Sequence, residues 1–140
     1  MSNVDLNRLG ATLLRVSLGV MYITHSIVLK WLTYTLQGTA QYFESIGLPA
    51  FSGYAVFALE AIGGVLLVLG IQTRVVALAL VPILIGATWA HIGNGWVFSN
   101  PNGGWEYPVY LIVISLVVAL QAPASKLFAT SAQADLQRAA

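Results

Sequence analysis

The sequence predicts an all-α integral membrane protein, built as a four-helix bundle with its N- and C-termini in the cytoplasm. Composition predicts the membrane class: hydrophobic residues make up 58% of the 140-residue chain, charged residues 8%, and mean hydropathy is +0.80. Soluble domains carry about 25% charged residues. The helix count follows from four apolar stretches of spanning length, and the orientation follows from the positions of the positive charges.

The first two apolar stretches cover about residues 9–32 and 53–70. The first exceeds, and the second approaches, the roughly 20 residues that a helix needs to cross the hydrocarbon core. Gly70 closes the second stretch, and glycine is the usual residue at the C-terminal end of a helix. We therefore expect the second helix to end at this residue.

The third and fourth apolar stretches cover about residues 74–92 and 106–122. Pro82 lies inside the third, where a kink is tolerated if neighbouring helices satisfy the freed backbone groups. Residues 71–73 are a tight turn, so the second and third helices should form an antiparallel hairpin. Longer polar connections over 33–52 and 94–105 join the other helices, and the latter is rich in glycine, asparagine and proline.

Domain organisation and direction follow from the same patterns. Residues 1–124 form one membrane domain, and residues 125–140 form a short polar tail. Cytoplasmic loops are enriched in lysine and arginine. One side of the predicted bundle carries Arg8, Arg74, Lys126 and Arg138, with Arg15 just inside, whereas the other carries mainly Lys30. Both termini are therefore predicted to be cytoplasmic, and both long connections face outward.

Each predicted helix brings one ionisable side chain to the outer half of the bundle. These residues are His25, Glu60, His91 and Glu106. A charge at membrane depth costs a few kcal/mol on insertion scales, so it is usually buried in protein and paired. We expect His25, His91 and Glu106 to be neighbours of Glu60.

Helical spacing orients this polar cluster. Glu60 shares a face with Gly63 and Gly64, three and four residues further on. Small residues let a neighbouring backbone approach closely at membrane helix interfaces, so the carboxylate should point into the bundle. Tyr22 lies one turn before His25. Arg15 is on the cytoplasmic side, where it either extends outward or reaches inward toward Glu60 or a backbone carbonyl.

Structural explanations exist for each of these residues alone. A lone intramembrane histidine is more often a helix–helix hydrogen bond than a ligand-binding group, whereas an intramembrane acid is functional by default. Glu106 alone would suit a helix N-terminus, where the helix dipole favours an anion. Trp105 and Tyr107 alone would be ordinary residues of the membrane interface. Four predicted helices each bring one of these ionisable residues to the same half of the bundle, and this convergence favours a functional site over four separate structural roles.

Three segments then show a family resemblance. The run Gly103-Gly104-Trp105-Glu106-Tyr107-Pro108 before the last predicted helix resembles the signature of the DoxX family of small four-helix membrane proteins. The ExxGG segment from Glu60 and the LGxxTR segment ending at Arg74 agree with it, as does His91 one turn before the glycine-containing loop. Ser26 departs from the family pattern, in which a glycine follows the histidine. The similarity extends over about residues 8–122.

The resemblance implies a class of function more than one reaction. DoxX relatives are described as membrane subunits linked to quinone-dependent oxidation, and as partners in thiol and oxidative-stress complexes. The resemblance also implies a multi-pass protein of a bacterial-type inner (cytoplasmic) membrane. Its expected partners are lipid and membrane or peripheral protein subunits, and homo-oligomers are left open. No nucleic-acid partner is indicated by the net charge of +1 and the lack of like-charge runs.

The first functional hypothesis is a quinone-binding subunit of an oxidoreductase. His25, Glu60 and His91 would hold the headgroup and exchange protons as the catalytic candidates, because imidazole titrates near neutrality. Glu106, Trp105, Tyr107, Tyr22 and Arg15 are the further ligand-binding candidates. The chain has no cysteine and no haem or flavin signature, so we expect no covalent cofactor, and electrons would come from a bound cofactor or a partner.

Three other hypotheses stay open at this stage. Two histidines with one or two carboxylates could hold a Zn²⁺, Fe²⁺ or Cu²⁺ ion, although no HxxxH or ExxH spacing occurs and no metal ligand is assigned. The chain could be a structural or assembly subunit, whose polar groups only fix helix packing. Movement of protons or small solutes is disfavoured because the ionisable groups gather in one half of the bundle.

Overall fold

Every regular element in the computed structural model, which describes residues 3–122, is helical. The elements in chain order are α1 (Asn3–Ile23), the π-helix η1 (Thr24–Thr33), α2 (Leu36–Ser45), α3 (Ala50–Leu69), α4 (Thr73–His91), the short 3₁₀ helix η2 (Ile92–Asn94) and α5 (Glu106–Gln121). The all-α prediction is confirmed for this part of the chain. The predicted polar tail over 125–140 lies outside the described residues.

Within residues 3–122, three helical segments are long and apolar enough to cross a membrane: Asn3–Thr33, Ala50–Leu69 and Thr73–Asn94. The first combines α1 and η1 into one continuous span. Helix α5 is apolar but shorter, at 16 residues. Large apolar side chains are exposed on these helices, including Ile62, Ile85 and Leu120. An outer surface of this kind suits lipid, so the chain is a multi-pass membrane protein.

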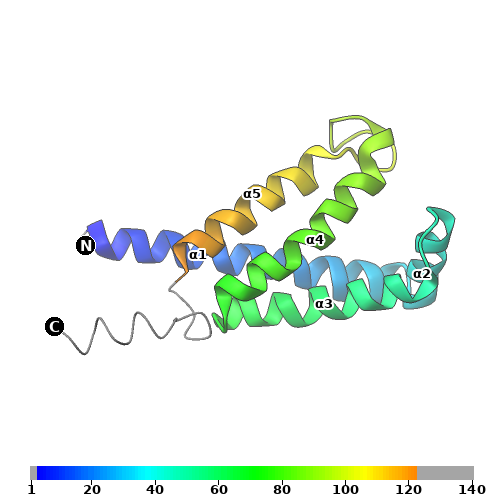
Figure 1. Cartoon of the computed structure of the whole chain (residues 1–140). Coiled ribbons are helices and arrows are strands. Elements are labelled where there is room, and N and C mark those ends of the chain that lie inside the picture. Colours follow the sequence, from blue (N-terminus) through cyan, green and yellow to red (C-terminus); the bar gives the residue numbers. More distant parts are fainter. Residues whose placement is uncertain (1–2, 123–140) are drawn as a thin grey trace, which may run out of the picture.

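The helices associate as two pairs that spread apart at one end (Figure 1). Helix α1 with η1 runs alongside α3, and α4 runs alongside α5. The two pairs approach each other near the α3–α4 turn and diverge toward the end that carries α2 and the α4–α5 loop. The buried apolar core gathers at the closed end: Leu18, Tyr22, Leu67, Ala77, Leu80, Leu84, Leu111, Val118 and Ala119.

Glycines set the close approach of the helices. A Cβ added at Gly64 would lie 2.9 Å from the carbonyl oxygen of Gly19, and one added at Gly63 would lie 2.8 Å from Leu80 Cδ1. The backbone of α1 therefore packs directly against Gly64, while a side chain of α4 packs directly against Gly63. Glu60 lies on the same buried face of α3. The predicted inward direction of this face is confirmed.

Helix ends agree with the sequence at Gly70 and differ in the first long connection. Gly70 has a left-handed φ of 74° and caps α3, and the Ile71 N–H donates to the Leu66 carbonyl at 2.9 Å. The segment 33–52, expected as a polar connection, instead contains the helix α2. Thr35 caps this helix by accepting a hydrogen bond from the Gly38 N–H at 3.1 Å.

Two arginines satisfy helix C-termini at the closed end of the bundle. Arg15 of α1 donates to the carbonyls of Leu67 and Val68 in the last turn of α3. Arg74 of α4 donates to the Ala119 carbonyl at 3.0 Å and the Ala122 carbonyl at 2.7 Å, at the end of α5. The last carbonyls of a helix lack intrahelical partners and carry partial negative charge. The arginines therefore join neighbouring helices where the core is tightest.

Replacing Arg15 with methionine is expected to destabilise the protein by about 2 kcal/mol, since two carbonyls lose charged hydrogen-bond donors in a partly buried position. Methionine keeps the apolar length of the side chain and removes the guanidinium. The free energy of unfolding in mixed detergent micelles measures the effect. Arg8→Met is the matched control, because Arg8 is exposed near the start of α1. Equal stability of the two variants would contradict the helix-capping role of Arg15.

Candidate functional site

A cavity of about 890 Å³ lies where the two helix pairs diverge. Its lining comes from the end of α1, η1, α2 and the connection after it, α3, α4, the α4–α5 loop and α5. Most of the wall is apolar, with Met21, Leu29, Phe43, Ile83 and Leu111 among the lining residues. Cavities that bind small molecules have this size and this mixture of apolar walls with a few polar groups.

The polar groups of the cavity come from separate elements. His25 and Lys30 are on η1, Ser52 and Glu60 on α3, His91 on α4, and Tyr107 on α5. His25, Glu60 and His91, the three catalytic candidates from the sequence, therefore border one cavity. Tyr22 and Tyr107 also line it.

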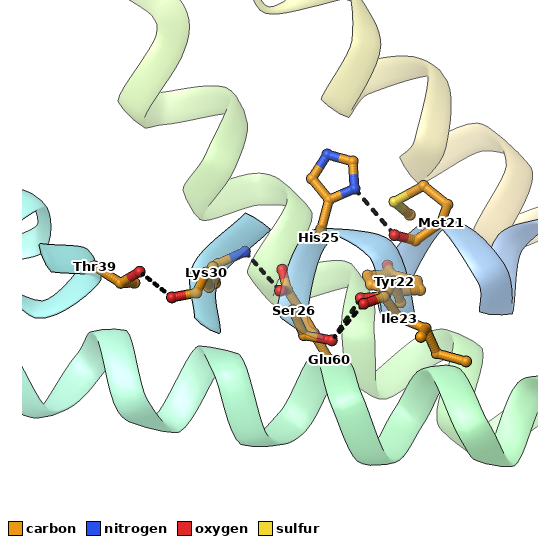
Figure 2. A network of polar contacts seen from close by, with 8 residues as sticks. All are labelled: Met21, Tyr22, Ile23, His25, Ser26, Lys30, Thr39 and Glu60. Carbon is orange, nitrogen blue, oxygen red and sulfur yellow. Dashed lines mark hydrogen bonds and ion pairs between the residues drawn. The ribbon is translucent and has the colours of Figure 1, made fainter. Parts of the chain in front are cut away.

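Glu60 forms an ion pair with Lys30 inside the bundle (Figure 2). Lys30 Nζ lies 2.6 Å from Glu60 Oε2, and the two side chains are 18% and 8% exposed, respectively. At this burial, attraction between the two charges offsets the loss of their hydration only if the pair is well formed. The Thr39 hydroxyl donates to the Lys30 carbonyl at 3.0 Å, so α2 supports the lysine backbone. The Glu60 charge is thus compensated by η1.

The π-helical backbone of η1 explains how Lys30 reaches this position. In an α-helix, five residues advance about 140° past a full turn, so His25 and Lys30 would face different directions. Hydrogen bonds in a π-helix join residues five apart, which brings such residues nearly into line. The Tyr34 N–H donates to the Leu29 carbonyl at 2.8 Å in this pattern. Both His25 and Lys30 consequently line the cavity.

The two histidines are held in the same way by their own helices. His25 Nδ1 lies 3.0 Å from the Met21 carbonyl oxygen, and His91 Nδ1 lies 2.8 Å from the Ala87 carbonyl oxygen. These bonds fix each ring relative to its helix and leave the Nε2 atoms without a bond to their own helix. In Figure 2 the second ring nitrogen of His25 points away from η1.

Two tyrosines flank the η1 histidine. The Tyr107 ring stacks on His25 with centroids 6.1 Å apart and planes inclined by 23°. Tyr22 is 1% exposed and belongs to the apolar core as well as to the cavity lining, so it forms part of the cavity floor.

The Ser26 hydroxyl donates to the Tyr22 carbonyl at 2.8 Å. Ser26, at the departure from the family pattern, is therefore accommodated within its own helix.

The glycine-rich loop before α5 closes one side of the cavity. Gly103 has a left-handed φ of 76°, and a Cβ there would lie 3.4 Å from His91 Cδ2. Gly104 is buried directly against the carbonyls of Trp96 and Val97. This glycine pair therefore lets the loop fold back against the end of α4 beside His91.

Glu106 and Trp105 organise this loop and do not line the main cavity. The Glu106 carboxylate accepts a hydrogen bond from the Phe98 N–H at 2.8 Å. Trp105 packs edge-on against Trp96, with ring centroids 4.4 Å apart. Glu106 borders a second hollow of about 420 Å³, lined by Trp96, Phe98, Glu106, Tyr107, Val109 and Tyr110. The expected grouping of Glu106 with Glu60 is not seen in the cavity lining.

Arg15 also lies away from the cavity, at the closed end of the bundle. Of the alternatives open for this residue, the structure shows the bond to backbone carbonyls. Sequence reasoning missed Lys30 as the partner of Glu60, because it treated residues 9–32 as a regular α-helix. The signal available was the need of an intramembrane carboxylate for a cation at similar depth.

The described residues contain no group of three or more His, Cys, Asp or Glu side chains placed to hold a metal ion. Glu60, the acidic residue of the cavity lining, pairs through Oε2 with Lys30 Nζ at 2.6 Å.

Fold and cavity together define a small multi-pass helical membrane protein with a largely apolar cavity and an internal ion pair. The DoxX family model matches residues 10–93, so the chain belongs to the DoxX family. The match includes His25, Lys30, Glu60 and His91, and the glycine-rich loop before α5 follows it.

A curated relative is the protein named "Putative oxidoreductase CatD" from Bacillus subtilis (strain 168). This chain is 43% identical to it over 79 residues, which cover 56% of this chain and 57% of the relative. The chain thus matches a little over half of that protein's length. No solved structure matches the chain.

Proposed function

We propose that this protein is a membrane subunit of an oxidoreductase system, and that its cavity holds a quinone ring or a similar small ligand. Family membership and the name of the Bacillus relative support the link to oxidoreductases. The observation that carries the ligand is the 890 Å³ cavity, where His25, His91 and the Lys30–Glu60 pair border apolar walls. A ring with two polar oxygens and an apolar tail fits such a lining.

The proposal includes an arrangement in the membrane. The α1–η1 segment, α3, α4 and the shorter α5 form four spans of a bacterial inner membrane, with both termini cytoplasmic. Arg15 and Arg74 at the closed end are consistent with the positive-inside rule. The cavity then opens in the outer half of the bilayer, where a lipid-soluble ring can enter from the membrane. The electron donor or acceptor would be a partner subunit or a bound cofactor.

Ligand binding tests this proposal directly. Purified protein in lipid nanodiscs is titrated with decylubiquinone and decylubiquinol, and saturable binding of at least one is expected. His25→Ala and His91→Ala should each weaken binding roughly tenfold, as expected for the loss of one hydrogen bond of about 1.4 kcal/mol. Thr88→Ala is the matched control, because Thr88 of α4 bonds its own helix at Leu84 and does not line the cavity. Absence of saturable binding of either compound would refute the quinone proposal.

A second candidate is a structural subunit of a larger membrane complex. The pairing of Glu60 with Lys30 favours it, because a satisfied ion pair can fix the packing of η1 on α3 without any ligand. The two candidates differ in what Glu60→Gln changes. A structural subunit loses assembly with its partners in this variant, whereas a ligand-binding subunit keeps its assembly and loses ring binding.

A further inference from the structure

The hydrogen bonds of the two cavity histidines define which ring nitrogen carries the proton. Each Nδ1 contacts a backbone carbonyl, of Met21 for His25 and of Ala87 for His91. A carbonyl oxygen only accepts hydrogen bonds, so each Nδ1 must be the protonated nitrogen. In a neutral imidazole the other nitrogen, Nε2, then carries a lone pair and acts as an acceptor. Both histidines therefore offer acceptors to the cavity.

The charged groups around the cavity favour these neutral rings. Glu60 is the acidic residue of the lining, and it already pairs with Lys30 at 2.6 Å. A second positive charge in a mostly apolar cavity would lack a dedicated counter-ion, and a buried charge without one is costly. Neutral His25 and His91 keep the cavity lining close to electroneutral.

The other polar groups of the cavity discriminate less between ligands. Lys30 Nζ uses one of its three donor hydrogens in the bond to Glu60, and its other hydrogens can meet a ring oxygen in either redox form. The hydroxyl groups of the lining, which belong to Tyr22, Tyr42, Ser52 and Tyr107, can either donate or accept. An oxidised quinone presents only acceptor oxygens, whereas its reduced form presents two hydroxyl donors. The acceptor nitrogens of His25 and His91 match hydroxyl groups and repel carbonyl oxygens.

We infer that the cavity selects the reduced, dihydroxy form of its ring ligand, with hydroxyl groups donating to Nε2 of His25 and His91. This inference rests on the proposed function and deepens it by naming the redox state that binds. Tighter binding of the reduced form raises the midpoint potential of the bound couple. For a two-electron couple, each tenfold preference corresponds to about 30 mV.

Comparison of the two redox forms tests the inference. Decylubiquinol and decylubiquinone are titrated anaerobically into the protein in nanodiscs. Every ring position of these compounds is substituted, so the Lys30 amine does not add covalently to the ring. The reduced form is expected to bind roughly tenfold more tightly, the difference made by about one matched hydrogen bond. Equal affinities, or tighter binding of the oxidised form, would overturn the inference and leave the proposed function standing. If neither form binds, both fall.

Glutamine variants and spectroscopy give a readout that a purely structural role does not move. In His25→Gln and His91→Gln the side-chain amide can turn its NH₂ toward the ligand and donate. The preference for the reduced form should therefore shrink toward equality in each variant, while Thr88→Ala keeps it. Nitrogen-15 NMR of labelled histidine should show a protonated Nδ1 and an unprotonated Nε2 in both rings. A protonated Nε2 in both would overturn the inference without any ligand experiment.

Discussion

Lys30→Met is expected to destabilise the protein by about 3 kcal/mol, since removal of one partner leaves an uncompensated charge in the interior. Glu60 keeps its place in α3, where its side chain is 8% exposed, and no longer has the ammonium group 2.6 Å away. Uptake of a proton by the carboxylate limits the cost to the lower end of the usual range for broken buried pairs. Denaturation in mixed detergent micelles, followed by circular dichroism, measures the difference.

A double-mutant cycle separates the ion pair from the side-chain packing. Glu60→Gln keeps the shape of the side chain and removes its charge, and the double variant Lys30→Met/Glu60→Gln leaves no buried charge at this position. The double variant should be more stable than the sum of the two single effects allows, by at least about 1.5 kcal/mol. Additive single effects would show that Lys30 and Glu60 do not interact in the folded protein.

The features predicted well from the sequence have strong local causes. Gly70 ends α3 because glycine adopts a left-handed conformation easily. The inward face of α3 follows from the helical spacing of Glu60, Gly63 and Gly64, which needs no knowledge of the other helices. Apolar stretches of spanning length placed α1 with η1, α3 and α4, because composition and length suffice for that assignment.

The features that were missed depend on tertiary contacts. Lys30 reaches the cavity through a π-helix, which is rare and leaves no clear pattern in the sequence. The sequence therefore predicts a regular helix for this segment and does not identify Lys30 as the cation for Glu60. Helix α2 was missed because its residues are mixed in polarity, and it is positioned by contacts with η1 and α3.

Residues in and beside the α4–α5 loop illustrate a different limit of prediction from the sequence. Glu106 begins α5, as the sequence predicts for the start of the last helix. Its carboxylate, however, accepts a hydrogen bond from the Phe98 N–H of the preceding loop, and depth alone does not determine such a choice. His91, in contrast, borders the cavity because Gly103 lets the loop pass beside its ring.

Gly64→Ala is expected to destabilise the protein by at least about 2 kcal/mol, because the added methyl group overpacks a backbone contact. The new Cβ would lie 2.9 Å from the Gly19 carbonyl oxygen and 3.0 Å from the Ile23 backbone nitrogen. Neither atom belongs to a flexible side chain, so α1 and α3 must separate. Alanine itself favours a helix by up to about 1 kcal/mol over glycine. A net loss of stability would therefore come from the overpacked contact and not from helix propensity.

Gly10→Ala is the matched control, since a Cβ at Gly10 of α1 meets nothing within 4 Å. Helix propensity then acts alone, and this variant should be equal to the native protein or more stable by up to about 1 kcal/mol. Separation of α1 from α3 would also shift η1, which continues from α1 and carries His25 and Lys30. Gly64→Ala should therefore weaken ring binding in nanodiscs, whereas Gly10→Ala should not. Matching effects of the two substitutions would show that the contact between Gly19 and Gly64 does not set the packing on which the cavity depends.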